Sequence, residues 1–232
     1  MVLRFLTITT LAGALLAAGC TLQETVQNPL TQRFAWFQYL NGNDVREGCF
    51  EGGLWRVRLI YNARYQEQIR VYNLVSDGAG GALAVARAQG PGNLVELGLG
   101  LDDVLAPWRW HRSEARLNQE ATETFFKRLT QSGFFEPAPV NLNLPSAGFY
   151  WIAVSCIAGQ VHFNAWRYPS ERYQALSFPE FLFALDKTGL AVNPPRPIDA
   201  AELILKPNNI QISGRQGTTF TLRVGRNGLA GY

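Results

Sequence analysis

The chain has 232 residues, of which 47% are hydrophobic and 12% aromatic, and its formal net charge is +3. This composition is typical of a packed globular domain and excludes a disordered chain. The nearly neutral charge argues against nucleic acid as a partner, and the length suffices for one core or two small ones.

The N-terminus has the pattern of a secretory signal. Arg4 is the only charged residue before Cys20, and an apolar run from Phe5 to Ala18 follows it. This run falls short of the roughly 20 residues that span a bilayer. It ends in Leu16-Ala17-Ala18-Gly19-Cys20, which resembles the lipobox of bacterial lipoproteins, although Ala17 stands where Leu is commonest. The alternative is an ordinary cleaved signal with a chance cysteine.

The resemblance implies a membrane anchor. In bacterial lipoproteins the cysteine thiol receives a diacylglycerol, the signal (here 1–19) is removed, and the new amino terminus is acylated. Three acyl chains on Cys20 would hold the protein firmly, because each buried CH₂ contributes about 0.8 kcal/mol. Thr21 rather than Asp follows, which in Gram-negative members of the family favours the outer membrane, facing the periplasm. Residues 20–33 are then a lipidated tether, and 34–232 a single domain.

The other two cysteines, Cys49 and Cys156, form an even pair in an oxidising compartment. We expect a disulfide between them, for which the chain-entropy estimate is about 4 to 5 kcal/mol. Two buried free thiols are the alternative.

The first part of the domain, 34–112, is expected to be β-rich. Four aromatic residues between 34 and 39 suggest either a first strand or a short amphipathic docking segment. Alternating apolar and polar residues, separated by turn residues, then predict an antiparallel meander of strands at 54–62, 67–75, 82–88 and 94–101.

Residues 113–232 are expected to hold two amphipathic helices and further strands. Asn118 is expected to cap a helix over 119–132, and Ser177 with Glu180 has the pattern of a capping box for a helix over 178–188. Strands are expected at 149–157, 161–167, 203–206, 210–213 and 218–224. The fold class is therefore α+β, with mainly antiparallel sheet.

The strongest candidate binding surface in the sequence is Trp108, Arg109, Trp110 and His111. Flat aromatic rings interleaved with Arg can stack on sugar rings or on a protein partner. The same spacing also fits an ordinary edge or core strand whose tryptophans point inward. This stretch is the basis for cell-wall glycan as one candidate partner.

No cofactor or metal is predicted. The glycine-rich stretch at 76–81 lacks the Gly-Lys-Ser/Thr ending of a phosphate loop, so a hairpin turn is favoured. His111 and His162 lie too far apart for a local zinc motif, and the Gly-x-Ser-x-Gly elbow of hydrolases is absent. Ser155 with His162 remains open as a convergent catalytic pair.

The sequence therefore favours a lipid-anchored periplasmic protein with a non-catalytic binding or assembly role at the outer membrane, with an envelope protein as partner. One alternative is an envelope hydrolase whose site is assembled by the fold. Another is a carbohydrate- or peptidoglycan-binding module that uses Trp108 and Trp110.

Overall fold

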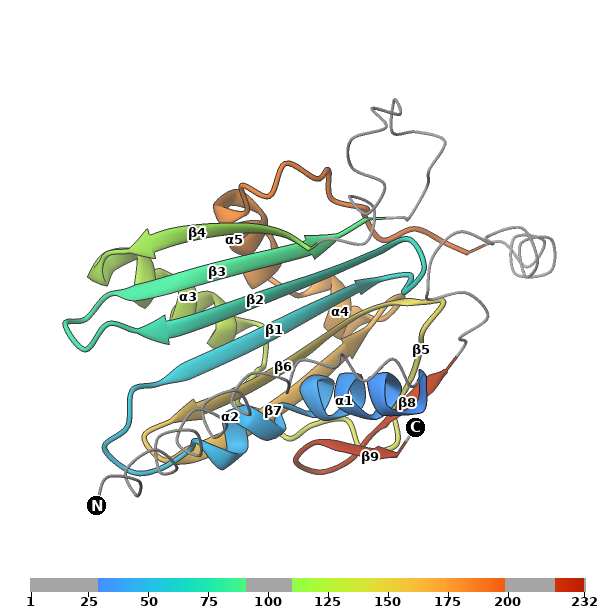
Figure 1. Ribbon diagram of the computed structural model, residues 1–232, viewed down its shortest axis with the longest axis horizontal. Coiled ribbons are helices and arrows are strands. Elements are labelled where there is room, and N and C mark those ends of the chain that lie inside the picture. Colours follow the sequence, from blue (N-terminus) through green and yellow to red (C-terminus); the bar gives the residue numbers. More distant parts are fainter. Residues whose placement is uncertain (1–28, 91–109, 199–219, 232) are drawn as a thin grey trace, which may run out of the picture. The chain divides into compact units, whose positions relative to one another are not determined.

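A computed structural model describes residues 29–90, 110–198 and 220–231 (Figure 1). The described residues from Phe37 onward belong to one compact unit. The elements follow in the order α1 (Pro29–Asn41), α2 (Asn43–Glu47), β1 (Arg56–Ala63), β2 (Gln68–Ser76), β3 (Ala82–Gln89), β4 (His111–Leu117), α3 (Gln119–Gln131), β5 (Asn143–Pro145), β6 (Phe149–Ile157), β7 (Gln160–Arg167), α4 (Glu171–Gln174), α5 (Phe178–Leu185), β8 (Thr221–Val224) and β9 (Leu229–Gly231).

Two antiparallel sheets dominate the fold. The larger has six strands in the order β4-β3-β2-β1-β6-β7, and the smaller has the order β5-β8-β9. The α+β class with mainly antiparallel sheet is therefore confirmed. The meander is also present, with β4 as its fourth strand (Figure 1). The predicted strands at 94–101, 203–206 and 210–213 lie outside the described residues, and neither β5 nor β9 was predicted.

The hairpin turns follow from local chemistry. Ala158 and Gly159 both have positive φ, 49° and 73°, as a two-residue turn between twisted strands requires. In the turn between β2 and β3, the Asp77 carboxylate accepts hydrogen bonds from the backbone N–H groups of Ala79 and Gly81. These N–H groups face the protein's own carboxylate and two strands flank the turn, so the prediction of a hairpin is confirmed.

Helices α3 and α5 cover one face of the larger sheet, where they lie behind it in Figure 1. Trp151 of β6 is at the centre of this core and is 1% exposed. Its ring stacks on Tyr61 of β1 at 4.8 Å and meets the edge of Phe178 of α5 at 5.1 Å. Burying one large apolar side chain contributes about 1.5 to 3 kcal/mol, so these rings fix how the helices sit on the sheet.

The opposite face of the sheet carries α2. The Arg58 guanidinium of β1 donates to both carboxylate oxygens of Asp44, at 2.7 and 2.5 Å. It also lies over the ring of Tyr39, 3.7 Å from the centroid. Val154 of β6 packs so closely against Gly42 that a Cβ there would lie 2.5 Å from a Val154 methyl. The residue between α1 and α2 must therefore be glycine.

The interpretation of 34–39 as a first strand is wrong, because this stretch is part of helix α1. Its sequence does not alternate, and the residues between and beside the aromatic ones, Arg33, Ala35, Gln38 and Leu40, favour helix. Pro29 is at the first helical position, where its missing N–H costs nothing. In the described ranges 29–90, 110–198 and 220–231, no helix is long and apolar enough to cross a membrane.

The two predicted helices exist, but only one is capped as predicted. The Asn118 side chain accepts from the Ala121 N–H at 2.9 Å and begins α3. Ser177 makes no capping hydrogen bond, and α5 ends at Leu185 rather than near 188. The Ser177 hydroxyl instead donates to the Arg128 carbonyl at the C-terminus of α3, 2.9 Å away. The capping box is therefore wrong, because this hydroxyl joins the two helices.

Candidate functional site

The predicted disulfide is present. Cys49, in the loop after α2, is bonded to Cys156 near the end of β6, with Cα atoms 5.4 Å apart. It closes a sequence separation of 107 residues. The alternative of two free thiols is therefore wrong. The lipidation candidate, Cys20, lies outside the described residues.

The tryptophan-rich candidate surface is only partly described. Trp108 and Arg109 lie outside the described residues. Trp110 is 37% exposed and directly precedes β4, and His111 begins that strand with an exposed side chain. Because β4 is the edge strand of the larger sheet, these two residues lie at an accessible border of the sheet.

The structure brings Ser155 and His162 together, but in a buried setting. They are direct partners across β6 and β7. Ser155 is 0% exposed, and its hydroxyl has no hydrogen-bond partner within the described part of the chain. Burial lowers the pKa of His162, and the ring of Phe135 meets its imidazole edge-on at 5.1 Å. A substrate cannot reach the serine hydroxyl in this arrangement.

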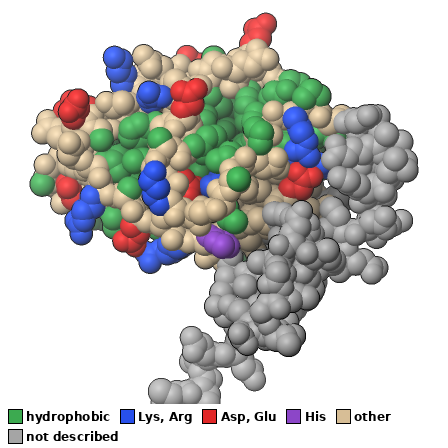
Figure 2. All heavy atoms as spheres, turned by 90° about the horizontal axis from the view of Figure 1, so that it is seen from above, with side chains coloured by type: hydrophobic (Ala, Val, Ile, Leu, Met, Phe, Trp, Pro, Cys, Tyr) green, Lys and Arg blue, Asp and Glu red, His purple; other side chains and the backbone are tan. Residues whose placement is uncertain are grey.

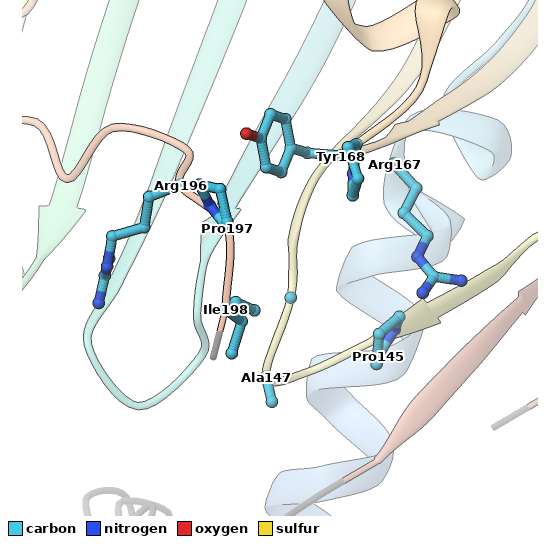
Figure 3. Close-up of a pocket in the computed structure, with 9 residues that line it drawn as sticks. Pro145, Ala147, Arg167, Tyr168, Arg196, Pro197 and Ile198 are labelled. Carbon is cyan, nitrogen blue, oxygen red and sulfur yellow. The ribbon is translucent and has the colours of Figure 1, made fainter. Parts of the chain in front are cut away.

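A cavity of about 420 Å³ lies at the end of the sheet where β7 ends and β6 begins (Figure 3). We call it the proline groove. Its volume is within the range of small-molecule sites, about 300 to 1,000 Å³. Its lining comes from three separate segments and consists of Pro145, Ala147, Gly148, Arg167, Tyr168, Pro169, Arg196, Pro197 and Ile198.

Figure 3 shows how the side chains surround the groove. Pro197 and Ile198 lie on one side, with Pro145 and Arg167 opposite, while the Arg196 side chain extends away from the groove. Sequence reasoning missed this site. A weak signal was present, since an arginine precedes proline by one or two residues at both 196–197 and 167–169.

Hydrogen bonds fix the turn between β5 and β6, which forms the floor of the groove. The Asn62 side-chain amide donates to the carbonyls of Ser146 and Gly148, at 3.1 and 2.6 Å. The backbone N–H of Ser146 donates to Phe220, and that of Gly148 donates to Pro145. The floor is therefore formed in the folded protein and does not need a ligand to order it.

The segment 186–198, which we call the arm, brings Pro197 and Ile198 to the groove. A buried ion pair at 2.5 Å between Arg70 of β2 and Asp186 holds its start, with side chains 1% and 2% exposed. Burial alone would raise the pKa of Asp186. Hydrogen bonds from Thr188, the Arg70 charge and a hydrogen bond from Tyr72 outweigh burial and hold this pKa below its usual value.

A second set of polar contacts holds the arm closer to the groove. The Asn193 side-chain amide donates to the Glu67 carboxylate and to the backbone carbonyl of Ala63. The backbone carbonyl of Asn193 accepts a hydrogen bond from the Tyr61 hydroxyl. The Gln68 side chain accepts from the Asn193 N–H and donates to the arm's backbone at 191. The arm is thus bound where β1 ends and β2 begins.

The two arginines that line the groove differ in electrostatic state. Arg196 donates to both carboxylate oxygens of Glu67, at 3.2 and 3.4 Å, so its charge is compensated. Arg167 is exposed, and its Nη1 donates to the Asn143 carbonyl at 3.2 Å. Among the described residues no carboxylate pairs with Arg167. The groove therefore combines apolar walls with one uncompensated positive charge.

Within the described ranges, no group of three or more His, Cys, Asp or Glu side chains is placed so that it could hold a metal ion. The chain as a whole matches no protein-family model, and no curated protein or solved structure is significantly similar to it.

Proposed function

We propose that this chain is a lipid-anchored protein of the bacterial cell envelope that acts by binding rather than by catalysis. The observation that carries the proposal is the Cys49–Cys156 disulfide. Structural disulfides persist in oxidising compartments such as the periplasm. The third cysteine of the chain, Cys20, directly follows the signal-like segment.

The proline groove supports the binding role. A preformed concave site with apolar walls and a few polar groups is the usual form of a small-ligand site. Among the described residues, its lining consists of prolines, one tyrosine, two arginines and small or aliphatic residues, with no acid, histidine, serine or cysteine that could act as base or nucleophile. Binding is therefore the activity that this lining fits best.

The test of the anchor compares the wild type with Cys20→Ala in a Gram-negative host. Membrane fractionation and mass spectrometry of the mature N-terminus are the readouts. We expect a triacylated Cys20 in the outer-membrane fraction and its loss in the variant. Thr21→Asp is a matched control, expected to keep the lipid but move the protein to the inner membrane. A wild-type protein with an unmodified Cys20 thiol would refute the anchor.

The exposure of Trp110 and His111 at the edge strand keeps glycan binding as a second candidate function. Peptidoglycan sedimentation of the wild type and of Trp110→Ala tests it. Retention of the wild type alone on the glycan would favour this role. Equal retention of both proteins, or of neither, would count against it.

A further inference from the structure

We propose that the proline groove binds a small anionic amphiphile, meaning an alkyl chain that carries one carboxylate or phosphate. This inference names a ligand for the binding role proposed above and rests on it. Three features of the groove carry the argument: its apolar walls, the prolines and hydrogen-bonded N–H groups in its backbone, and the charge of Arg167.

The walls suit an alkyl chain. Pro145 and Ala147 face Pro197 and Ile198 across the cavity, with the ring of Tyr168 closing one side (Figure 3). Ring methylenes, methyl groups and an aromatic face offer dispersion contacts without directional requirements. Apolar surface that leaves water in such a groove contributes roughly in proportion to its area.

The backbone of the groove is poorly suited to an extended peptide. Three of its nine lining residues are prolines, which have no N–H. The N–H of Gly148 donates to Pro145, and that of Tyr168 donates to Phe149, so both are already used. These five residues offer no N–H to the carbonyls of a bound peptide, and burying a carbonyl without a donor is costly, whereas an alkyl chain has no polar group to satisfy.

The charge at the edge of the groove selects an anion. The Arg167 guanidinium donates one hydrogen bond to the Asn143 carbonyl and has further N–H groups that could bind a ligand. Among the described residues, no carboxylate pairs with its positive charge. Guanidinium groups pair well with both carboxylate and phosphate. Glu67 neutralises Arg196 on the far side of the arm, so the positive charge is concentrated at Arg167.

The experiment uses the mature chain from residue 20 on, exported with a cleavable leader and carrying Cys20→Ser so that no competing detergent is needed. Titration calorimetry compares decanoate and decyl phosphate, which distinguish the two head groups, with uncharged decanamide and with an oligoproline decapeptide. Methyl NMR signals of Ala147 and Ile198 report whether a probe occupies the groove. All probes stay below their micelle concentrations.

We expect one decanoate or decyl phosphate per chain and weaker binding of decanamide. Arg167→Gln should weaken the binding of both anions about 5-fold and leave the binding of decanamide unchanged. Ile198→Asp should abolish binding of both alkyl anions and of decanamide. Arg223→Gln, an exposed arginine of β8 outside the groove, is the matched control and should change nothing.

Three results would overturn the inference: no binding of either anion to the wild type, equal effects of Arg167→Gln and Arg223→Gln, or tighter binding of the oligoproline. The titrated chain carries no lipid, so these results leave the anchor untouched. A failed lipidation assay likewise leaves the titration valid. The two proposals can therefore fail separately.

Discussion

The two ends of the six-stranded sheet are secured by different chemistry. At the disulfide end, where β1 begins and β6 ends, a covalent bond ties the loop after α2 to the sheet. At the groove end, the Arg70–Asp186 pair and the contacts of Glu67 with Arg196 hold the arm against β1 and β2. A covalent link constrains the unfolded chain at any pH, while a polar network acts only while both partners are charged.

The two ends also present apolar side chains differently. Phe50 and Leu54, in the loop beside the disulfide, are 64% and 52% exposed. At the groove end, apolar side chains line a concave cavity of about 420 Å³. On the face seen in Figure 2, apolar side chains gather in a central band with charged side chains around it. The groove end thus offers a cavity of the size of a small-ligand site.

The largest effect is expected at the disulfide end. Cys49→Ala with Cys156→Ala should lower the free energy of unfolding by about 4 to 5 kcal/mol, because the bond closes a long loop. Urea denaturation with and without reductant measures it. Cys20→Ala is the control, expected to unfold like the wild type. An equal response of wild type and double variant to reductant would contradict the prediction.

A single substitution at the groove end should destabilise the fold. Arg70→Met leaves the Asp186 carboxylate buried without its cation and should cost about 3 kcal/mol in urea denaturation. Arg112→Met removes an ion pair with Glu114 whose side chains are 55% and 47% exposed, so it should cost less than about 1 kcal/mol. Similar losses in both variants would show that burial of the pair is unimportant.

Acid should weaken the groove end selectively. The folded pKa of Asp186 is depressed, so its pairing stabilises the fold above the unfolded value of about 3.9 and is lost as pH falls through the folded pKa. Urea midpoints of wild type and Asp186→Asn should therefore converge below about pH 4. A constant difference between them from pH 7 to pH 3 would argue against this assignment.

At the groove end, a smaller loss of stability than for Arg70→Met is expected from Glu67→Gln, about 0.5 to 1 kcal/mol, because its pairs with Arg64 and Arg196 are partly exposed. The substitution leaves Arg196 uncompensated and should tighten decanoate binding if the groove selects anions. Hydrogen exchange of the arm should also speed up, while exchange in the loop around Cys49 stays unchanged. Faster exchange at both ends would mean that the ends are not independent.

Much of the sheet was predictable because strand signals are local. Alternation of apolar and polar residues placed β1, β2, β3, β6 and β7 within two residues of their observed bounds. Asn118 was a correct cap because a cap contacts a residue only three positions away. The prediction that Ser177 caps a helix was wrong for the opposite reason. Its hydroxyl donates a hydrogen bond to the Arg128 carbonyl, 49 positions away, and a local sequence pattern carries no information about such a contact.

The sequence by itself determined the strand-and-turn order, the α+β class and the pairing of Cys49 with Cys156, because side-chain alternation, turn residues and an even cysteine count are readable along the chain. Only the tertiary structure decided where a ligand could bind. The groove joins residues 145–148, 167–169 and 196–198, which the sheet register and the arm bring together. Which arginine carries a charge without a paired carboxylate depends on Glu67, 129 positions from Arg196, and only folding brings Glu67 and Arg196 into contact.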